Sequence, residues 1–231
     1  MIHGTMDRSG SFARAVRRLP DLRVLTYDRR GYGRSADLPP ASRLEPHVDD
    51  LVTILDGRTA TIIGHSFGGD VAFAFALSRP DLTRAVGAYE PPMPWIPWWP
   101  EGGASLRIRG LGIEDPGDVA EEFLKQVAGP AVWDALPERT KSLRRAEGPA
   151  VLGDIAALTS GPPPFDVAAL AALDVPVFLA SGERSKPHQR DGTARLAREL
   201  GAPLTIISEA RHGGHSSHPE DFAEWVRHIV A

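Results

Sequence analysis

The stretch Ala60–Leu77, ATIIGHSFGGDVAFAFAL, decides the fold, because in it an apolar β-branched run gives way to an alanine-rich helical pattern. Ser66 stands at the change, with Gly64 and Gly68 on either side. A strand that turns sharply into a helix holds its turn residue in a strained conformation, with the side chain projecting above the sheet. Glycines flank such a turn because β-carbons there would collide with neighbouring backbone. The pattern predicts that Ser66 is a nucleophile and that the Phe67 amide, at the helix N-terminus, faces a developing oxyanion.

On both sides of this stretch, short apolar runs alternate with helical patterns, which indicates an α/β fold with a mostly parallel sheet flanked by helices. The runs predict strands over Arg23–Asp28, Ala60–Gly64, Ala85–Tyr89, Val175–Ala180 and Pro203–Ser208. The helical patterns cover Ser11–Leu19, Glu45–Leu55, Phe67–Ser78, Asp191–Leu200 and Pro219–Val230.

Residues 91–174 differ in character from the rest of the chain. The segment begins, directly after Glu90, with the proline- and tryptophan-rich run PPMPWIPWWPEGG. It continues through short helical pieces and ends near SGPPPFD. Proline-rich boundaries on both sides are typical of an insertion. We therefore expect a core formed by 1–90 and 175–231, with 91–174 as a helical cap or lid over the site.

Composition narrows the kinds of protein this can be. The formal net charge is −4 without long charged blocks, which argues against nucleic-acid or membrane partners. There are no cysteines, so disulfides and thiolate sites are excluded, and we expect neither a metal nor a cofactor. The N-terminal residues MIHGTMDRSG show no signal-peptide pattern, and no apolar run is long enough to span a bilayer, so we expect a cytoplasmic protein.

A serine hydroxyl needs a base, since it is a weak nucleophile at its free pKa. Eight histidines are present, and the best placed lie in EARHGGHSSHPEDF, between the last apolar run and the final helix. The residues from that segment are His212, His215 and His218. The order serine, acid, histidine along the chain matches a hydrolase triad.

Four motifs together resemble the α/β-hydrolase superfamily over nearly the whole chain. They are the pair His3-Gly4, YDRRGYGRS at Tyr27–Ser35, GHSFGG at Gly64–Gly69, and the histidine loop. The resemblance implies the fold and a hydrolytic site, and says little about the substrate. Relatives usually carry strands before the motif that matches His3-Gly4. Either the start of the chain is defined too late, or the sheet lacks its first strands, in which case a second copy in a homodimer could cover the exposed edge.

The resemblance also assigns roles to individual residues. It implies that His212, seven positions before Pro219, is the catalytic histidine, with His215 as the alternative. It gives the second oxyanion donor as the amide of Thr5, paired with that of Phe67. His3 would order the loop that carries Thr5, and His65 would be structural.

The triad acid departs from the family pattern. Most relatives place an Asp where this chain has Ser185. Haloalkane dehalogenases instead take the acid from the end of the strand equivalent to Ala85–Tyr89, and Glu90 stands there, followed by prolines and tryptophans as in those enzymes. Glu90 is thus the favoured acid and Glu183 the alternative. Dehalogenation is not implied, because those enzymes use an Asp nucleophile and this chain has Ser66.

Apolar residues of the cap are expected to line the substrate pocket, although some of the tryptophans could instead attach the cap to the core. These residues are Met93, Trp95, Ile96, Trp98 and Trp99, with Phe123 and Trp133 as further candidates. No basic cluster faces the serine along the sequence, which favours neutral esters over phosphorylated substrates. Asp70, in the first turn of the helix after Ser66, is expected to offset the helix dipole.

The leading hypothesis is a serine hydrolase that cleaves esters of small-to-medium hydrophobic substrates through an acyl-enzyme. A second hypothesis keeps the triad but applies it to lactones, carbon–carbon bonds or perhydrolysis. A third is a ligand-binding protein on this scaffold without catalysis. The sequence leaves these three open.

Overall fold

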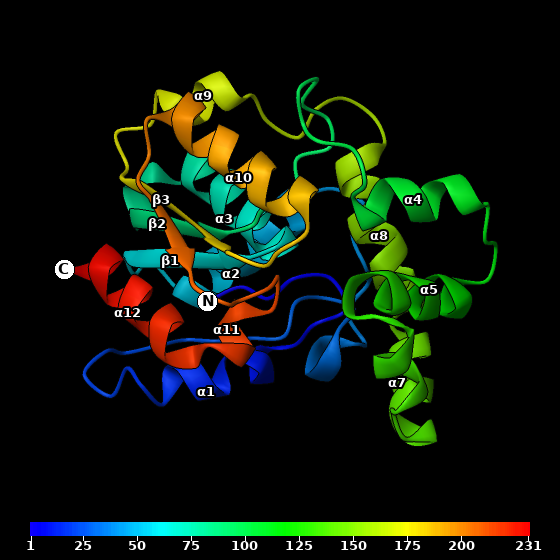
Figure 1. Cartoon of the computed structure of the whole chain (residues 1–231). Helices are drawn as coiled ribbons and strands as arrows, with labels where there is room; N and C mark the ends of the chain where they lie inside the picture. The colour runs from blue at the N-terminus through cyan, green and yellow to red at the C-terminus, as the bar shows by residue number, and fades with distance from the viewer.

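The computed structural model describes all 231 residues, and a four-stranded parallel sheet forms its centre (Figure 1). The strand order is β1-β2-β3-β4, and adjacent strands in this order are parallel throughout. The strands are β1 (Ala60–His65), β2 (Thr83–Tyr89), β3 (Val177–Gly182) and β4 (Leu204–Ile207). All four carboxyl ends therefore meet at one edge of the sheet, where open α/β sheets bind their ligands.

Helices cover both faces of the sheet (Figure 1). One face carries α2 (Glu45–Leu55), α3 (Phe67–Ser78), α9 (Val167–Ala171) and α10 (Pro187–Leu200). The other carries α1 (Ala13–Val16), α11 (Gly214–Ser217) and α12 (Pro219–Val230). Short 3₁₀ turns at Ser9–Phe12, Gly33–Ser35 and Pro80–Leu82 complete this part of the chain. The expected α/β fold is therefore present.

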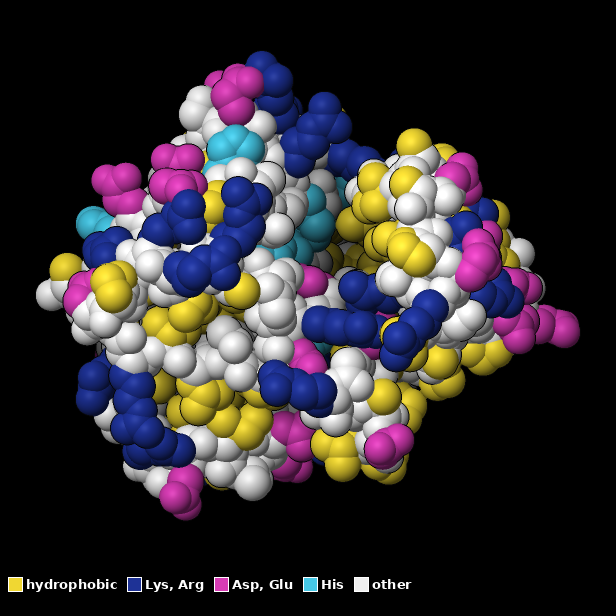
Figure 2. Space-filling view, turned by 90° about the horizontal axis from the view of Figure 1, so that it is seen from below, with side chains coloured by type: hydrophobic (Ala, Val, Ile, Leu, Met, Phe, Trp, Pro, Cys, Tyr) yellow, Lys and Arg dark blue, Asp and Glu magenta, His cyan; other side chains and the backbone are white.

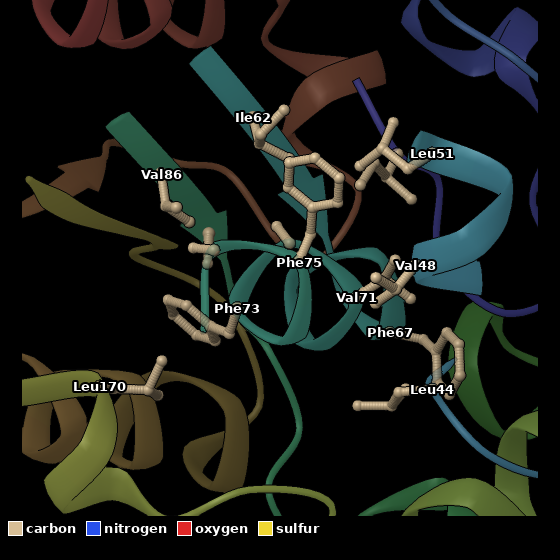
Figure 3. Packing of buried hydrophobic residues seen from close by; sticks show 14 of the residues in the cluster. Leu44, Val48, Leu51, Ile62, Phe67, Val71, Phe73, Phe75, Val86 and Leu170 are labelled. Carbon is tan, nitrogen blue, oxygen red and sulfur yellow. The ribbon is translucent and has the colours of Figure 1, made fainter. Parts of the chain in front are cut away.

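The larger apolar core forms around α3, which explains why that helix reads as apolar on every side. Phe67, Phe73 and Phe75 point away from it in different directions, toward α2, α9 and the sheet (Figure 3). A helix that is apolar all round is buried, and α3 packs against β1 and β2 on one side and α2 on another. This packing fixes the start of α3, and with it Ser66.

Five helices between β2 and β3 lie together beyond the carboxyl end of the sheet (Figure 1). They are α4 (Ala104–Leu111), α5 (Pro116–Ala128), α6 (Pro130–Asp134), α7 (Glu138–Ala146) and α8 (Gly148–Thr159). Of these, α4, α5 and α8 share a separate apolar cluster that includes Met6 and Tyr32 from the rest of the chain, and α6 and α7 pack on α5. The sixth helix of this region, α9, packs on α3 and α10 instead, so the helical layer of the sheet extends into the range expected for the cap.

The expected strand over Arg23–Asp28 is wrong, because this segment is extended but forms no ladder. Met1 donates its amino group to Leu25 O at 2.7 Å, and Ile2 forms an isolated bridge with Gly64. Only Met1 and Ile2 lie between this segment and β1. Two residues are too few to form a ladder of repeating hydrogen bonds with either neighbour. The structure also shows no helix long and apolar enough to cross a membrane.

Candidate active site

Ser66 occupies a sharp turn between β1 and α3, with φ 53° and ψ −129°. Non-glycine residues seldom adopt positive φ, and such strain is found at functional sites. A β-carbon on Gly64 would lie 2.1 Å from Gly68 O, and one on Gly68 would lie 2.2 Å from Ile2 O. Both positions therefore require glycine, as the sequence predicts.

The loop after Ile2 lies directly against this turn, since a β-carbon on Gly4 would come within 2.9 Å of Ser66 Cβ. The main-chain amides of Thr5 and Phe67, expected to be the oxyanion donors, have no acceptor within the protein. Thr5 also lines the cavity into which Ser66 opens. The Thr5 amide is therefore open to a ligand in the cavity, and the Phe67 amide lies next to Ser66 without an acceptor in the protein.

His3 and Arg29 hold that loop in place. His3 Nδ1 donates to Gly4 O at 2.8 Å, and the Arg29 amide donates to His3 Nε2 at 2.8 Å. The buried Arg29 guanidinium donates to His3 O at 2.9 Å and pairs with both carboxylate oxygens of Asp154 at 3.0 and 2.7 Å. Thr5 Oγ1 also donates to Asp154, at 2.8 Å. The loop is thus attached to α8 through one buried carboxylate.

Glu90 and His212 form the central pair of the site. His212 Nδ1 lies 2.6 Å from Glu90 Oε2, and the Glu90 side chain is fully buried. The other oxygen, Oε1, accepts from Ser181 Oγ at 2.6 Å and from the Gly182 amide at 2.9 Å. Burial alone would raise the pKa of Glu90, but the His212 and serine hydrogen bonds outweigh it and lower that pKa. Glu90 is therefore an anion, and Nε2 of His212 is left to take a proton.

The loop that carries His212 is held through its main chain. His65 Nε2 donates to His212 O at 2.8 Å, and Tyr89 Oη donates to Arg211 O at 2.9 Å. Both donors come from the ends of β1 and β2, so the sheet itself orients the imidazole. This gives His65 the structural position expected for it.

The alternative residues lie elsewhere. Glu183 is exposed and accepts from Ser208 Oγ at 2.8 Å and from the Glu209 amide at 2.9 Å, away from His212. His215 is buried with Nε2 3.3 Å from Asp7 Oδ2. The structure therefore brings Glu90, and not Glu183, to His212.

Asp7, His65 and His215 form a cluster whose ligand atoms lie within 4.8 Å of one another. Two imidazoles and a carboxylate are ligands that suit Zn²⁺ or a similar cation. The same side chains also satisfy one another in part, since His215 contacts Asp7 directly and Ser11 Oγ donates to Asp7 at 2.8 Å. The expectation that the chain holds no metal stays a prediction.

A cavity of about 620 Å³ opens beside Ser66 and His212. Its wall on the side of α5 and α6 is largely apolar, and includes Phe123, Leu124, Val127 and Val132. The hollow is visible between the two lobes of the molecule, with histidine side chains recessed in it (Figure 2). A cavity of this size is typical of a small-molecule site.

The expected pocket residues are mostly not in this cavity, which corrects the sequence-based assignment. Trp99 and Phe123 line it. Trp95, Ile96 and Trp98 line a separate hollow near α9, while Met93 is enclosed in the main core and Trp133 is buried among the helices of the cap. The proline-rich segment turns at Met93–Trp99, so neighbouring residues face different parts of the protein.

Sequence reasoning also missed residues that the fold brings to the site. Asp154 is one, and no local pattern marks it, because it lies 125 residues from Arg29. Arg107, Lys186 and Arg211 are others, and all three line the cavity. These three residues come from distant segments, so the sequence alone, in which no basic cluster faces the serine, did not show that they line one cavity.

Comparisons with known proteins agree with the fold. A family model described as "Alpha/beta hydrolase family" matches residues 1–225. A putative carbamate hydrolase, RutD, from Rhizobium rhizogenes is 30% identical over 221 residues, which cover 87% of this chain and 80% of that protein. The lipase LipV of Mycobacterium tuberculosis is 32% identical over 93 residues, 39% of this chain, and the match spans only 35% of the lipase.

Among solved structures, a thermophilic esterase from Thermogutta terrifontis superposes with a TM-score of 0.75. The superposition covers 99% of this chain and 87% of the esterase, at 21% sequence identity. At that identity the likeness bears on the fold alone.

Proposed function

The chain belongs to the alpha/beta hydrolase family, and from that premise we propose that it is a serine hydrolase that cleaves carboxylic esters through an acyl-enzyme on Ser66. One observation carries the proposal: the buried Glu90 carboxylate lies 2.6 Å from His212 Nδ1, and His212 and Ser66 open onto the same cavity. An acid, a base and a nucleophile supplied by three loops at one sheet edge are the requirements of acyl transfer.

The proposed mechanism follows from these positions. Ser66 Oγ attacks the ester carbonyl carbon while His212 Nε2 takes the hydroxyl proton. Glu90 accepts a hydrogen bond from Nδ1–H of His212. This bond keeps Nε2 as the basic nitrogen, and the carboxylate charge stabilises the imidazolium. The oxygen that becomes negative is held by the Thr5 and Phe67 amides, and loss of one such donor typically costs about 10²- to 10³-fold in rate. His212 returns the proton to the leaving alcohol, and water then releases the acid by the same steps.

A fluorophosphonate probe, which reacts with activated serines, tests the proposal. The wild-type protein should be labelled and should hydrolyse p-nitrophenyl esters, and Ser66→Ala should lose both. Ser216→Ala is the matched control, because Ser216 lines the same cavity but lies outside the proposed mechanism. Labelling that persists in Ser66→Ala would defeat the proposal, and ligand binding without turnover in the wild type would favour a binding protein.

Carbamates are a second candidate substrate class, suggested by the name of the RutD relative and its coverage of 87% of this chain. The same triad can attack a carbamate carbonyl, which differs from an ester in bearing nitrogen. Parallel assays of matched p-nitrophenyl esters and carbamates separate the two. Lactones and carbon–carbon substrates belong in the same panel, because the triad alone does not distinguish them.

A further inference from the structure

Three cationic side chains line the active-site cavity without any carboxylate to neutralise them. They are Arg107 on α4, Lys186 at the start of α10, and Arg211 beside His212. None of them takes part in an ion pair, whereas most other arginines of the chain do. The cavity's two acids are already engaged, Glu90 by His212 and Asp7 by His215. The cavity therefore carries uncompensated positive charge.

The first two of these cations lie close together on one side of the cavity. Arg107 Nη2 and His188 Nδ1 both lie within 3.5 Å of the same point beside Gly102. Lys186 Nζ donates to Gln126 O on α5 at 2.6 Å, which holds the ammonium over the cavity between the sheet and the helices beyond it. Burial and the charges of Lys186, His212 and Arg107 lower the pKa of His188 to about 4, so the imidazole adds no charge of its own at neutral pH.

The three cations are exposed, whereas Ser66 is half-buried at the turn after β1. Apolar side chains of α5 line the same cavity. Basic side chains are visible beside the hollow that contains the histidines (Figure 2). A ligand in the cavity would thus meet the Thr5 loop beside Ser66, apolar side chains and positive charge.

From this arrangement we infer that the enzyme prefers esters whose acyl chain ends in a carboxylate, and that Arg107 and Lys186 bind that carboxylate. The inference rests on the proposed ester hydrolysis and adds its substrate class. A groove lined by one sign of charge raises the local concentration and association rate of oppositely charged substrates.

Three substrates that differ only at the chain end test this inference: p-nitrophenyl hexanoate, mono-p-nitrophenyl adipate, and the matching ester that ends in trimethylammonium. At low ionic strength kcat/KM should be highest for the adipate, about tenfold above the hexanoate, and lowest for the cationic ester. The preference should shrink between about 20 mM and about 500 mM salt, because the cations are exposed and therefore screened. Equal values for all three esters would overturn the inference while leaving ester hydrolysis intact.

The double variant R107Q/K186Q should bring the ratio of adipate to hexanoate close to one. Its control is R109Q/R198Q, which removes the same charge from exposed positions of the same helices, outside the cavity, and should keep the wild-type ratio. A ratio that survives R107Q/K186Q, or falls equally in the control, would contradict the assignment.

A binding measurement separates failure of this inference from failure of the proposed function. Isothermal titration of Ser66→Ala with monomethyl adipate should show binding that weakens at least about tenfold when R107Q/K186Q is added. If no ester is hydrolysed, ester hydrolysis is wrong, and this titration alone decides the carboxylate site: binding that depends on Arg107 and Lys186 supports it, and binding that does not overturns it.

Discussion

The chemistry proposed for this protein depends on one carboxylate, because Glu90 sets which nitrogen of His212 is basic. Replacing it by Gln keeps the size of the side chain but removes the negative charge that stabilises the imidazolium. We expect Glu90→Gln to lower kcat by about 10³-fold with little change in KM. Steady-state kinetics with a p-nitrophenyl ester measure this directly.

Glu183→Gln is the matched control for that experiment, since it makes the same change to an exposed glutamate near the carboxyl end of β3. It should keep the wild-type kcat. Circular dichroism of both variants should match the wild type, which would show that the loss is chemical. A large loss in Glu183→Gln with normal kinetics in Glu90→Gln would reverse the assignment of the acid.

Residues near one another in sequence were the ones that could be predicted. The turn at Ser66 is encoded by its own neighbours, since Gly64 and Gly68 collide with nearby backbone if they gain a β-carbon. Glu90 could be proposed because it directly follows a predicted strand, at the position where the resemblance to haloalkane dehalogenases places the acid. Asp154 could not be found from the sequence, because its partner Arg29 is 125 residues away. No sequence pattern around either residue indicates that the two pair.

At the scale of the element, Asp70 gives α3 an unusual property. The sequence suggested an anion that offsets the helix dipole, but Asp70 is fully buried and neither carboxyl oxygen has a partner. Burial, together with the charge of Asp154, raises the pKa of Asp70 well above its usual value. The structure therefore argues against the expected role, because a raised pKa favours the neutral carboxyl group, which contributes no charge to the helix end.

This predicts a pH dependence of stability. The folded protein keeps the Asp70 proton to higher pH than the unfolded chain, so stability is lost as pH rises from about 4 toward the raised folded pKa. The slope from this group is at most about 1.4 kcal/mol per pH unit. Asp70→Asn removes the titrating group. In urea unfolding from pH 5 to pH 8, the free energy of unfolding of the variant should therefore rise relative to that of the wild type as pH increases. Parallel curves would show that Asp70 is ionised.

Helices and strands were predicted correctly where the local sequence pattern is matched by neighbouring elements that can pack against it. β1 and α3 form as expected, because an apolar run and an apolar helix both find buried neighbours. The segment Arg23–Asp28 has the pattern of a strand but only Met1 and Ile2 beside it, so it forms no ladder. Trp95 and Trp98 also lack a local signal for their position. Their apolar character predicts that they are covered by other residues, but it does not predict which of the two hollows they line.

At the scale of the whole molecule, the buried pair of Arg29 and Asp154 joins α8 to the loop that carries Thr5. Removing one partner of a buried ion pair leaves an uncompensated charge, at a cost of about 3–5 kcal/mol. We expect Asp154→Asn to lower the free energy of unfolding by this order, as measured by urea denaturation.

Two further variants make that result specific. The double variant R29M/D154L, which replaces the pair by apolar side chains of similar volume, should recover much of the stability lost in Asp154→Asn. Asp81→Asn breaks an exposed pair with Arg79 and should change little. If Asp154→Asn unfolds like the wild type, the pair does not hold the two parts of the molecule together.

Ser66 and Glu90 both have positive φ, and they end two neighbouring strands. Such backbone is tolerated only where the surroundings over-determine it, and here the ladder between β1 and β2 does so. Glycine at either position would relax the backbone there, and it would remove a side chain on which the proposed reaction depends. Backbone strain is therefore placed at two residues of the proposed triad, and relief of that strain at residue 66 would cost the protein its proposed nucleophile.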